Sequence, residues 1–170
     1  MQEVIPVAKS KPYSSIPVKA VDAAALARAH ARQACVLGVD VGKFELMAVL
    51  RWPDGSFERP WRVANPGELG MLIAKLSELR TAGPAAPVVA LESSGTYGDA
   101  LRRALSDAAI PTQRVSAKAV KDQAESFDGV PSQHDGKDAA VIADLCARGK
   151  GRQWTLRAAS VPPSTSSIVK

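Results

Sequence analysis

The sequence CVLGVDVGKFELMAVLRW, residues 35–52, holds two short apolar runs that are separated by a more polar turn. Short runs rich in β-branched and aliphatic residues are typical of buried strands, so we predict strands over Cys35–Val41 and roughly Glu45–Trp52. Residues 53–56, PDGS, are a favourable turn sequence, and an extended segment resumes over Phe57–Val63. These residues therefore predict an antiparallel meander of three strands.

Helices and strands alternate after this meander. Leucines repeat at three- to four-residue spacing through to Arg80, which predicts a helix capped by Asn65 with Pro66 at its first position. The remaining predicted elements are a buried strand over Val88–Glu92, a helix from Thr96 to about Ala109, a strand over Pro111–Val115, a helix over Lys118–Ser126, and a last helix that starts near Asp135 and is closed by residues 149–151. This order predicts an α/β fold with a mixed central sheet of about five strands and flanking helices.

Both ends of the chain differ from this central part in composition. Residues 1 to about 19 combine three prolines with Ser and Lys and show no period, which predicts a disordered or loosely attached arm. Asp22 can cap an Ala-rich helix that runs toward Gln33. The last residues, from Arg157, are rich in Pro, Ser and Thr. We therefore predict an N-terminal arm with a possible helix over residues 1–33, one domain over residues 34–154 and a disordered tail over residues 155–170.

Charge and composition narrow the class of protein. The 170 residues include 22 Lys and Arg against 17 Asp and Glu, which gives a net charge of +5 and favours an anionic partner such as nucleic acid. Cys35 and Cys146 lie far apart and outside any C-x-x-C pattern, which argues against a disulfide framework and favours two small core residues. No window has the length of a membrane span, and no signal peptide is recognisable, so we expect no membrane partner and a cytoplasmic protein.

Four carboxylates occupy informative positions in these predicted elements. Asp40 lies in the first strand, Glu92 ends the strand over Val88–Glu92, and Asp135 and Asp138 lie three residues apart on one face of the last helix. A carboxylate in an apolar strand is costly unless it is paired or bound to a metal. Hard oxygen ligands suit magnesium, and two ions about 4 Å apart can support phosphodiester chemistry. The alternatives are that Glu92 and Asp135 only cap helices and that Asp138 only offsets a helix dipole.

Three blocks of sequence resemble the motifs of DEDD-type insertion-sequence transposases, the Piv-like recombinases: GVDVGKFE at residues 38–45, ALESSGTYG at 90–98 and HDGKDAAVIADL at 134–145. Their order and spacing agree with the RuvC-like domain of that family, over about Val36–Trp154. The resemblance implies a ribonuclease-H-like fold and DNA strand cleavage and transfer in transposition. It also implies the tetrad Asp40, Glu92, Asp135 and Asp138 as catalytic residues and ligands of Mg²⁺, with two ions expected and Mn²⁺ as a substitute. Among the implied partners are DNA, a structured guide RNA in some members and further copies of the chain.

The sequence departs from that family at two places. Gln133-His134 precedes Asp135 where Lys-Thr is commoner, and Ser93-Ser94 follows Glu92 where Ala or Pro and then Thr is frequent. Family members also carry a C-terminal domain with a serine proposed as nucleophile, and no serine of this sequence can be assigned that role. A truncated, non-catalytic nucleic-acid-binding remnant is therefore one alternative function. A stand-alone Holliday-junction-type nuclease is another, and an actin-like phosphotransferase ranks last because the chain is too short for two lobes.

Basic and aromatic residues near the motifs are further candidates. Five basic residues flank the last two helices and are predicted to follow a nucleic-acid backbone beside the carboxylates, with solvated surface charge as the alternative: Lys118, Lys121, Arg148, Lys150 and Arg152. Tyr97 is expected either to stack on a base or to pack against the sheet. Lys43 and His134 are expected to be exposed.

Overall fold

The computed structural model describes residues 14–30, 33–82, 87–93, 95–126 and 136–154. Within these residues, the strands are β1 (Ile16–Pro17), β2 (Val36–Val41), β3 (Glu45–Arg51), β4 (Trp61–Ala64), β5 (Val88–Glu92), β6 (Thr112–Val115) and β7 (Arg152–Gln153). The α-helices are α1 (Ala23–Ala29), α2 (Leu69–Ala82), α3 (Asp99–Asp107), α4 (Ala117–Ser126) and α5 (Lys137–Ala147), with a short 3-10 helix, η1, over Val18–Ala20. None of the described helices is long and apolar enough to cross a membrane.

All the described strands form one mixed sheet in the order β1-β4-β3-β2-β5-β6-β7. The pairs β2–β3 and β3–β4 are antiparallel, so the predicted meander is confirmed. Strands β2, β5 and β6 are parallel to one another. The sheet has seven strands instead of about five, because the two-residue strands β1 and β7 add to its edges.

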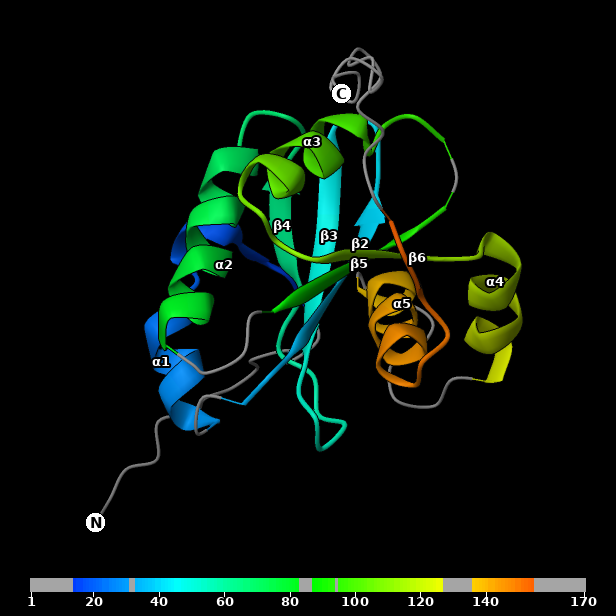
Figure 1. Ribbon diagram of the computed structural model, residues 1–170, viewed down its shortest axis with the longest axis horizontal. Helices are drawn as coiled ribbons and strands as arrows, with labels where there is room; N and C mark the ends of the chain where they lie inside the picture. The colour runs from blue at the N-terminus through cyan, green and yellow to red at the C-terminus, as the bar shows by residue number, and fades with distance from the viewer. Residues whose placement is uncertain (1–13, 31–32, 83–86, 94, 127–135, 155–170) are drawn as a thin grey trace, which may run out of the picture.

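Helices cover both faces of this sheet (Figure 1). Apolar side chains of α1, α2 and α3 pack in one large cluster with alternate residues of the strands, such as Leu37 and Val39 of β2. The opposite face packs against α4 and α5, and the buried cluster there includes Ala90, Val115, Val120 and Ile142. Successive side chains of a strand point to opposite faces of the sheet, so alternate residues pack into two separate cores, one on each face.

Helix α5 lies directly against β2, and Gly38 permits this contact. A Cβ atom on Gly38 would lie 2.1 Å from the backbone oxygen of Ala139 and 2.6 Å from the backbone nitrogen of Ala143. Both are helix backbone atoms that no rotamer change can move aside. The missing side chain at Gly38 therefore sets how closely α5 approaches the sheet.

The predicted starts of one strand and of one helix are wrong. The strand predicted over Phe57–Val63 begins only at Trp61, since Phe57 forms a single bridge to Arg51 and Pro60 has no N–H for a ladder. Helix α2 begins at Leu69, not at Pro66, and the Asn65 amide donates instead to the backbone oxygens of Gly42 and Tyr97.

The N-terminal arm was also predicted to be loosely attached up to about residue 19, and this is wrong for its last part. Ile16 and Pro17 pair with Trp61 and Arg62 of β4, and Val18 is fully buried. Residues 1–13 and 155–170, which include the first part of the predicted arm and the whole predicted tail, lie outside the described residues.

Several local predictions are confirmed. The Asp22 side chain accepts a hydrogen bond of 3.0 Å from the backbone nitrogen of Ala25 and so caps α1. Strand β5 covers the predicted residues. Cys35 and Cys146 are free and buried, as expected of small core residues.

Candidate functional site

Asp40 is the fifth residue of β2 and lies on the face of the sheet that α5 covers. Val36 and Gly38, four and two residues earlier, are on that face, because Val36 packs with the α4 and α5 cluster and Gly38 contacts α5. Leu37 and Val39 alternate onto the other face. The strand period therefore directs the Asp40 side chain toward α5, although the sequence around it is uniformly apolar.

Glu92 is placed beside Asp40 by the parallel register of β2 and β5. Val39 pairs with Leu91, so Asp40 and Glu92 each follow the last paired position. Val88 and Ala90 pack with the α4 and α5 cluster, and Glu92 continues that alternation. Both carboxylates therefore lie at the same end and on the same face of the sheet.

Asp138 faces this strand end from the first turn of α5. Its neighbour Ala139 lies over Gly38 of β2, which fixes the start of the helix against the strand that carries Asp40. Burial, followed by the charges of Asp138 and Glu92, raises the pKa of Asp40 from its ordinary value of 3.8 to about 6. The three predicted carboxylates thus share one electrostatic environment.

A cleft of about 370 Å³ opens at this position. It is lined by two of the predicted acids, Glu92 and Asp138, and by two lysines, Lys121 of α4 and Lys137 of α5. Its other lining residues are Ala117, Val120, Ala124 and Glu125. Lys137 was missed by the sequence analysis, although its position beside Asp138 at the start of a predicted helix was a usable signal.

The carboxylates do not form a closed metal site by themselves. Among the described residues, no three His, Cys, Asp or Glu side chains converge closely enough to hold an ion. Asp135, the fourth predicted ligand, lies outside the described residues, as does His134. The donor chemistry nevertheless fits a hard cation, since three carboxylates of like charge lie together, and the charges of Asp138 and Glu92 add to the larger effect of burial in raising the pKa of Asp40.

The structure places the predicted basic residues at different distances from the carboxylates. Lys121 lines the cleft, and Lys118 on the same helix pairs with Asp122 at 2.8 Å. Arg148 caps the other end of α5, about 15 Å from Asp138 at 1.5 Å per residue, and pairs with Asp144. Lys150 and Arg152 follow it, and Arg152 belongs to the edge strand β7. Arg148 thus lies away from the cleft that Lys121 lines, and the contact of all five residues with nucleic acid stays a prediction.

Two aromatic residues are exposed in loops at the carboxylate end of the sheet. Tyr97 is 51% exposed, so the alternative that it packs against the sheet is wrong, and Phe44, which the sequence analysis did not single out, is 74% exposed. Asn65 ties their loops together by donating to Gly42 and Tyr97, while its backbone nitrogen donates to the oxygen of Phe44. Lys43 is exposed, as expected.

The raised pKa of Asp40 predicts how stability changes with pH in the absence of metal. The folded chain holds this proton up to about pH 6, whereas the unfolded chain releases it near 3.8, so the contribution of Asp40 to stability falls as the pH rises through this window. We expect a loss of about 1–3 kcal/mol between pH 4 and pH 7. Denaturant unfolding of the unchanged chain and of Asp40→Asn, both in the presence of a chelator, measures this loss of stability. Equal pH slopes for the two proteins would contradict the prediction.

Comparison with known proteins gives three findings. A family model described as Transposase, for the DEDD type, matches residues 37–161. The RuvC protein of T. thermophilus, in a structure with a Holliday junction substrate, has a TM-score of 0.50 and 16% identity over 72% of this chain and 100% of that one. A second Thermus thermophilus RuvC structure has a TM-score of 0.49 and 17% identity over 71% of this chain and 99% of that one.

No curated protein matches the sequence significantly. The fold is thus that of RuvC, the predicted ribonuclease-H-like fold.

Proposed function

Because the chain belongs to the DEDD transposase family, we propose that it acts as a catalytic domain for metal-dependent cleavage and transfer of DNA strands in the transposition of an insertion sequence. The proposal rests above all on one observation. Asp40 is half-buried at a strand end where the charges of Asp138 and Glu92 both act on it. A structural carboxylate in such a position would be expected to face a cation of the protein, whereas this one faces two further acids.

We assign the metal to this strand end. Asp40, Glu92 and Asp138, together with Asp135, would hold Mg²⁺, with two ions expected and Mn²⁺ as a substitute. When bound, the ions supply Lewis-acid stabilisation of the charge on the phosphate and activation of the attacking oxygen. The protein's own part is to fix the carboxylates through the β2–β5 register and the contact between α5 and Gly38.

The lysines of the cleft complement the carboxylates. Lys121 and Lys137 lie in the same cleft as Glu92 and Asp138, so they can draw a DNA phosphate toward an otherwise acidic site. Lys118, Arg148, Lys150 and Arg152 are proposed as further contacts with DNA outside the cleft, with Arg152 on the other face of the sheet. The proposal also includes a structured guide RNA and further copies of the chain as partners, and a cytoplasmic location.

Cleavage assays with branched and linear DNA test the proposed function. We expect Mg²⁺-dependent cleavage or strand transfer that Asp138→Asn removes and that Asp107→Asn retains, since Asp107 is an exposed acid at the end of α3. Cleavage of branched DNA alone, without strand transfer, would instead support a junction nuclease. DNA binding without cleavage in any metal would overturn the catalytic assignment and support a remnant.

A further inference from the structure

The edge of the sheet formed by β6 and β7 presents arginines on the face opposite the carboxylate cleft. In β6, Gln113 and Val115 face α5, because Gln113 accepts a hydrogen bond from the Cys146 thiol and Val115 packs in the α4 and α5 cluster. The strand period therefore places Thr112 and Arg114 on the other face, where α3 lies. Thr112 indeed lines a cavity together with Arg102 and Ser106 of α3.

Two arginines face each other across this edge. Arg114 pairs with Arg152 in the antiparallel register, so their Cβ atoms are about 5 Å apart on one face. Both residues are exposed, and in the described part of the chain neither forms an ion pair. Like charges directly opposite one another destabilise a strand pair unless an anion lies between them. This pair therefore points to an anionic ligand.

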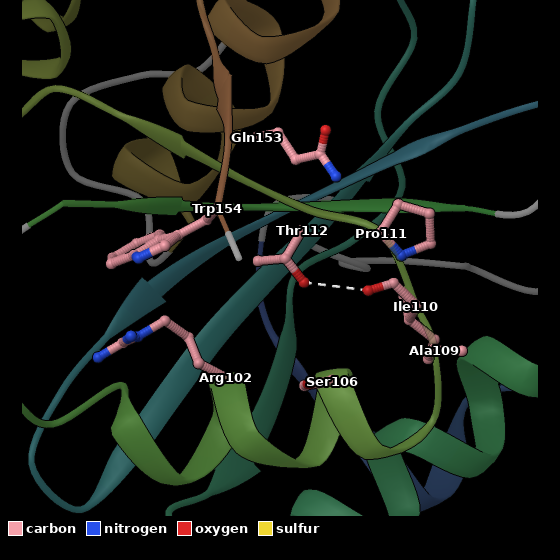
Figure 2. Close-up of a pocket in the computed structure, with 8 residues that line it drawn as sticks. All are labelled: Arg102, Ser106, Ala109, Ile110, Pro111, Thr112, Gln153 and Trp154. Atoms are coloured by element: carbon pink, nitrogen blue, oxygen red, sulfur yellow. Dashed lines mark hydrogen bonds between the residues drawn. The ribbon is translucent and has the colours of Figure 1, made fainter. Parts of the chain in front are cut away.

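A third arginine is held in place on the same face. The backbone nitrogen of Trp154 donates to the oxygen of Thr112 at 2.9 Å, which continues the β6–β7 register. The Arg102 guanidinium lies over the Trp154 ring, 4.4 Å from its centroid, and pairs with Asp99. Figure 2 shows Arg102 reaching from α3 toward Trp154, beside a cavity of about 270 Å³. Stacking on tryptophan orients a guanidinium whose remaining donors can bind an anion.

From this arrangement we infer a second nucleic-acid-binding surface, formed by Arg102, Arg114, Arg152 and Trp154 and called the arginine edge below. Its ligand is the phosphodiester backbone, because three guanidiniums against one carboxylate suit a series of phosphates and the bidentate geometry of arginine matches each of them. Arg114 pairs with Leu91, the residue before Glu92, so one nucleic acid can reach both faces of this strand end. This inference rests on the proposed function only in taking nucleic acid as the ligand.

Binding without metal tests the arginine edge apart from cleavage. We expect Arg114→Ala/Arg152→Ala in the full chain to weaken binding of a DNA duplex about 60-fold at 0.1 M salt, and to lower the slope of log K against log salt by about 1.8, since each phosphate contact contributes about 0.9. The matched control is Arg28→Ala/Arg103→Ala, which removes the same charge from exposed positions of α1 and α3. Single-stranded DNA and RNA probes show which backbone is preferred.

The outcomes separate this inference from the proposed function. Equal affinity and equal salt slope for the two double variants, both folded by circular dichroism, would overturn the arginine edge. Trp154→Leu provides a second measurement, because it leaves all charges in place but releases Arg102, and we expect it to weaken binding less than the double arginine variant does. A chain that binds through the arginine edge but never cleaves DNA would sustain this inference and overturn the catalytic function.

Discussion

Replacing Asp40 by Asn is expected to slow DNA cleavage strongly while making the metal-free chain more stable at neutral pH. Removal of one carboxylate of the proposed metal site should lower the rate by roughly 10³-fold, since metal ions contribute several kcal/mol to stabilising a transition state. At the same time the amide removes a half-buried charge that Asp138 and Glu92 repel, so the free energy of unfolding at pH 7 should rise by about 1–3 kcal/mol. Cleavage assays and denaturant unfolding measure the two effects.

Opposite signs in activity and stability distinguish a functional carboxylate from a structural one. A structural Asp40 would contribute hydrogen bonds or an ion pair to folding, and Asn would then lower the free energy of unfolding. The exposed variant Asp107→Asn should change neither quantity. Full activity of Asp40→Asn in Mg²⁺ would remove Asp40 from the site, whatever happens to stability.

The sequence predicted best those residues whose surroundings follow from the spacing of apolar residues and from the order of strands and helices along the chain. The apolar runs predicted β2, β3 and β5, and parallel strand ends on one side of a sheet bring Asp40 and Glu92 together. Strands β1 and β7 could not be predicted, because two residues are too few to show an alternation.

Surface positions were harder to predict, since their neighbours come from distant parts of the chain. Arg148, Lys150 and Arg152 were predicted to bind the same nucleic-acid backbone as Lys121. They follow the far end of α5, so the length of that helix separates Arg148 from the first-turn residue Asp138. Arg114 lies within a short predicted strand and belongs to none of the sequence motifs. Only the pairing of β6 with β7 places it opposite Arg152. The arginine edge therefore depends on strand register, which a single sequence does not specify.

Gly38→Ala is expected to disrupt both the fold and the site. The new Cβ atom would meet backbone atoms of Ala139 and Ala143 at 2.1 and 2.6 Å, so α5 must move away from β2. Overpacking of this kind costs about 3 kcal/mol or more when the obstructing atoms are backbone. Asp138 moves with α5, and so cleavage should fall even under conditions in which the variant is folded.

Gly70→Ala is the matched control for this prediction. A Cβ atom on Gly70 in α2 meets nothing within 4 Å, so the same chemical change should be neutral or should stabilise the helix by about 0.5–1 kcal/mol. Both variants reduce the entropy of the unfolded chain alike, and their difference in unfolding midpoint therefore isolates the clash with α5. If Gly38→Ala unfolds at the midpoint of Gly70→Ala and still cleaves DNA, then the close contact of α5 with β2 does not hold Asp138 beside Asp40.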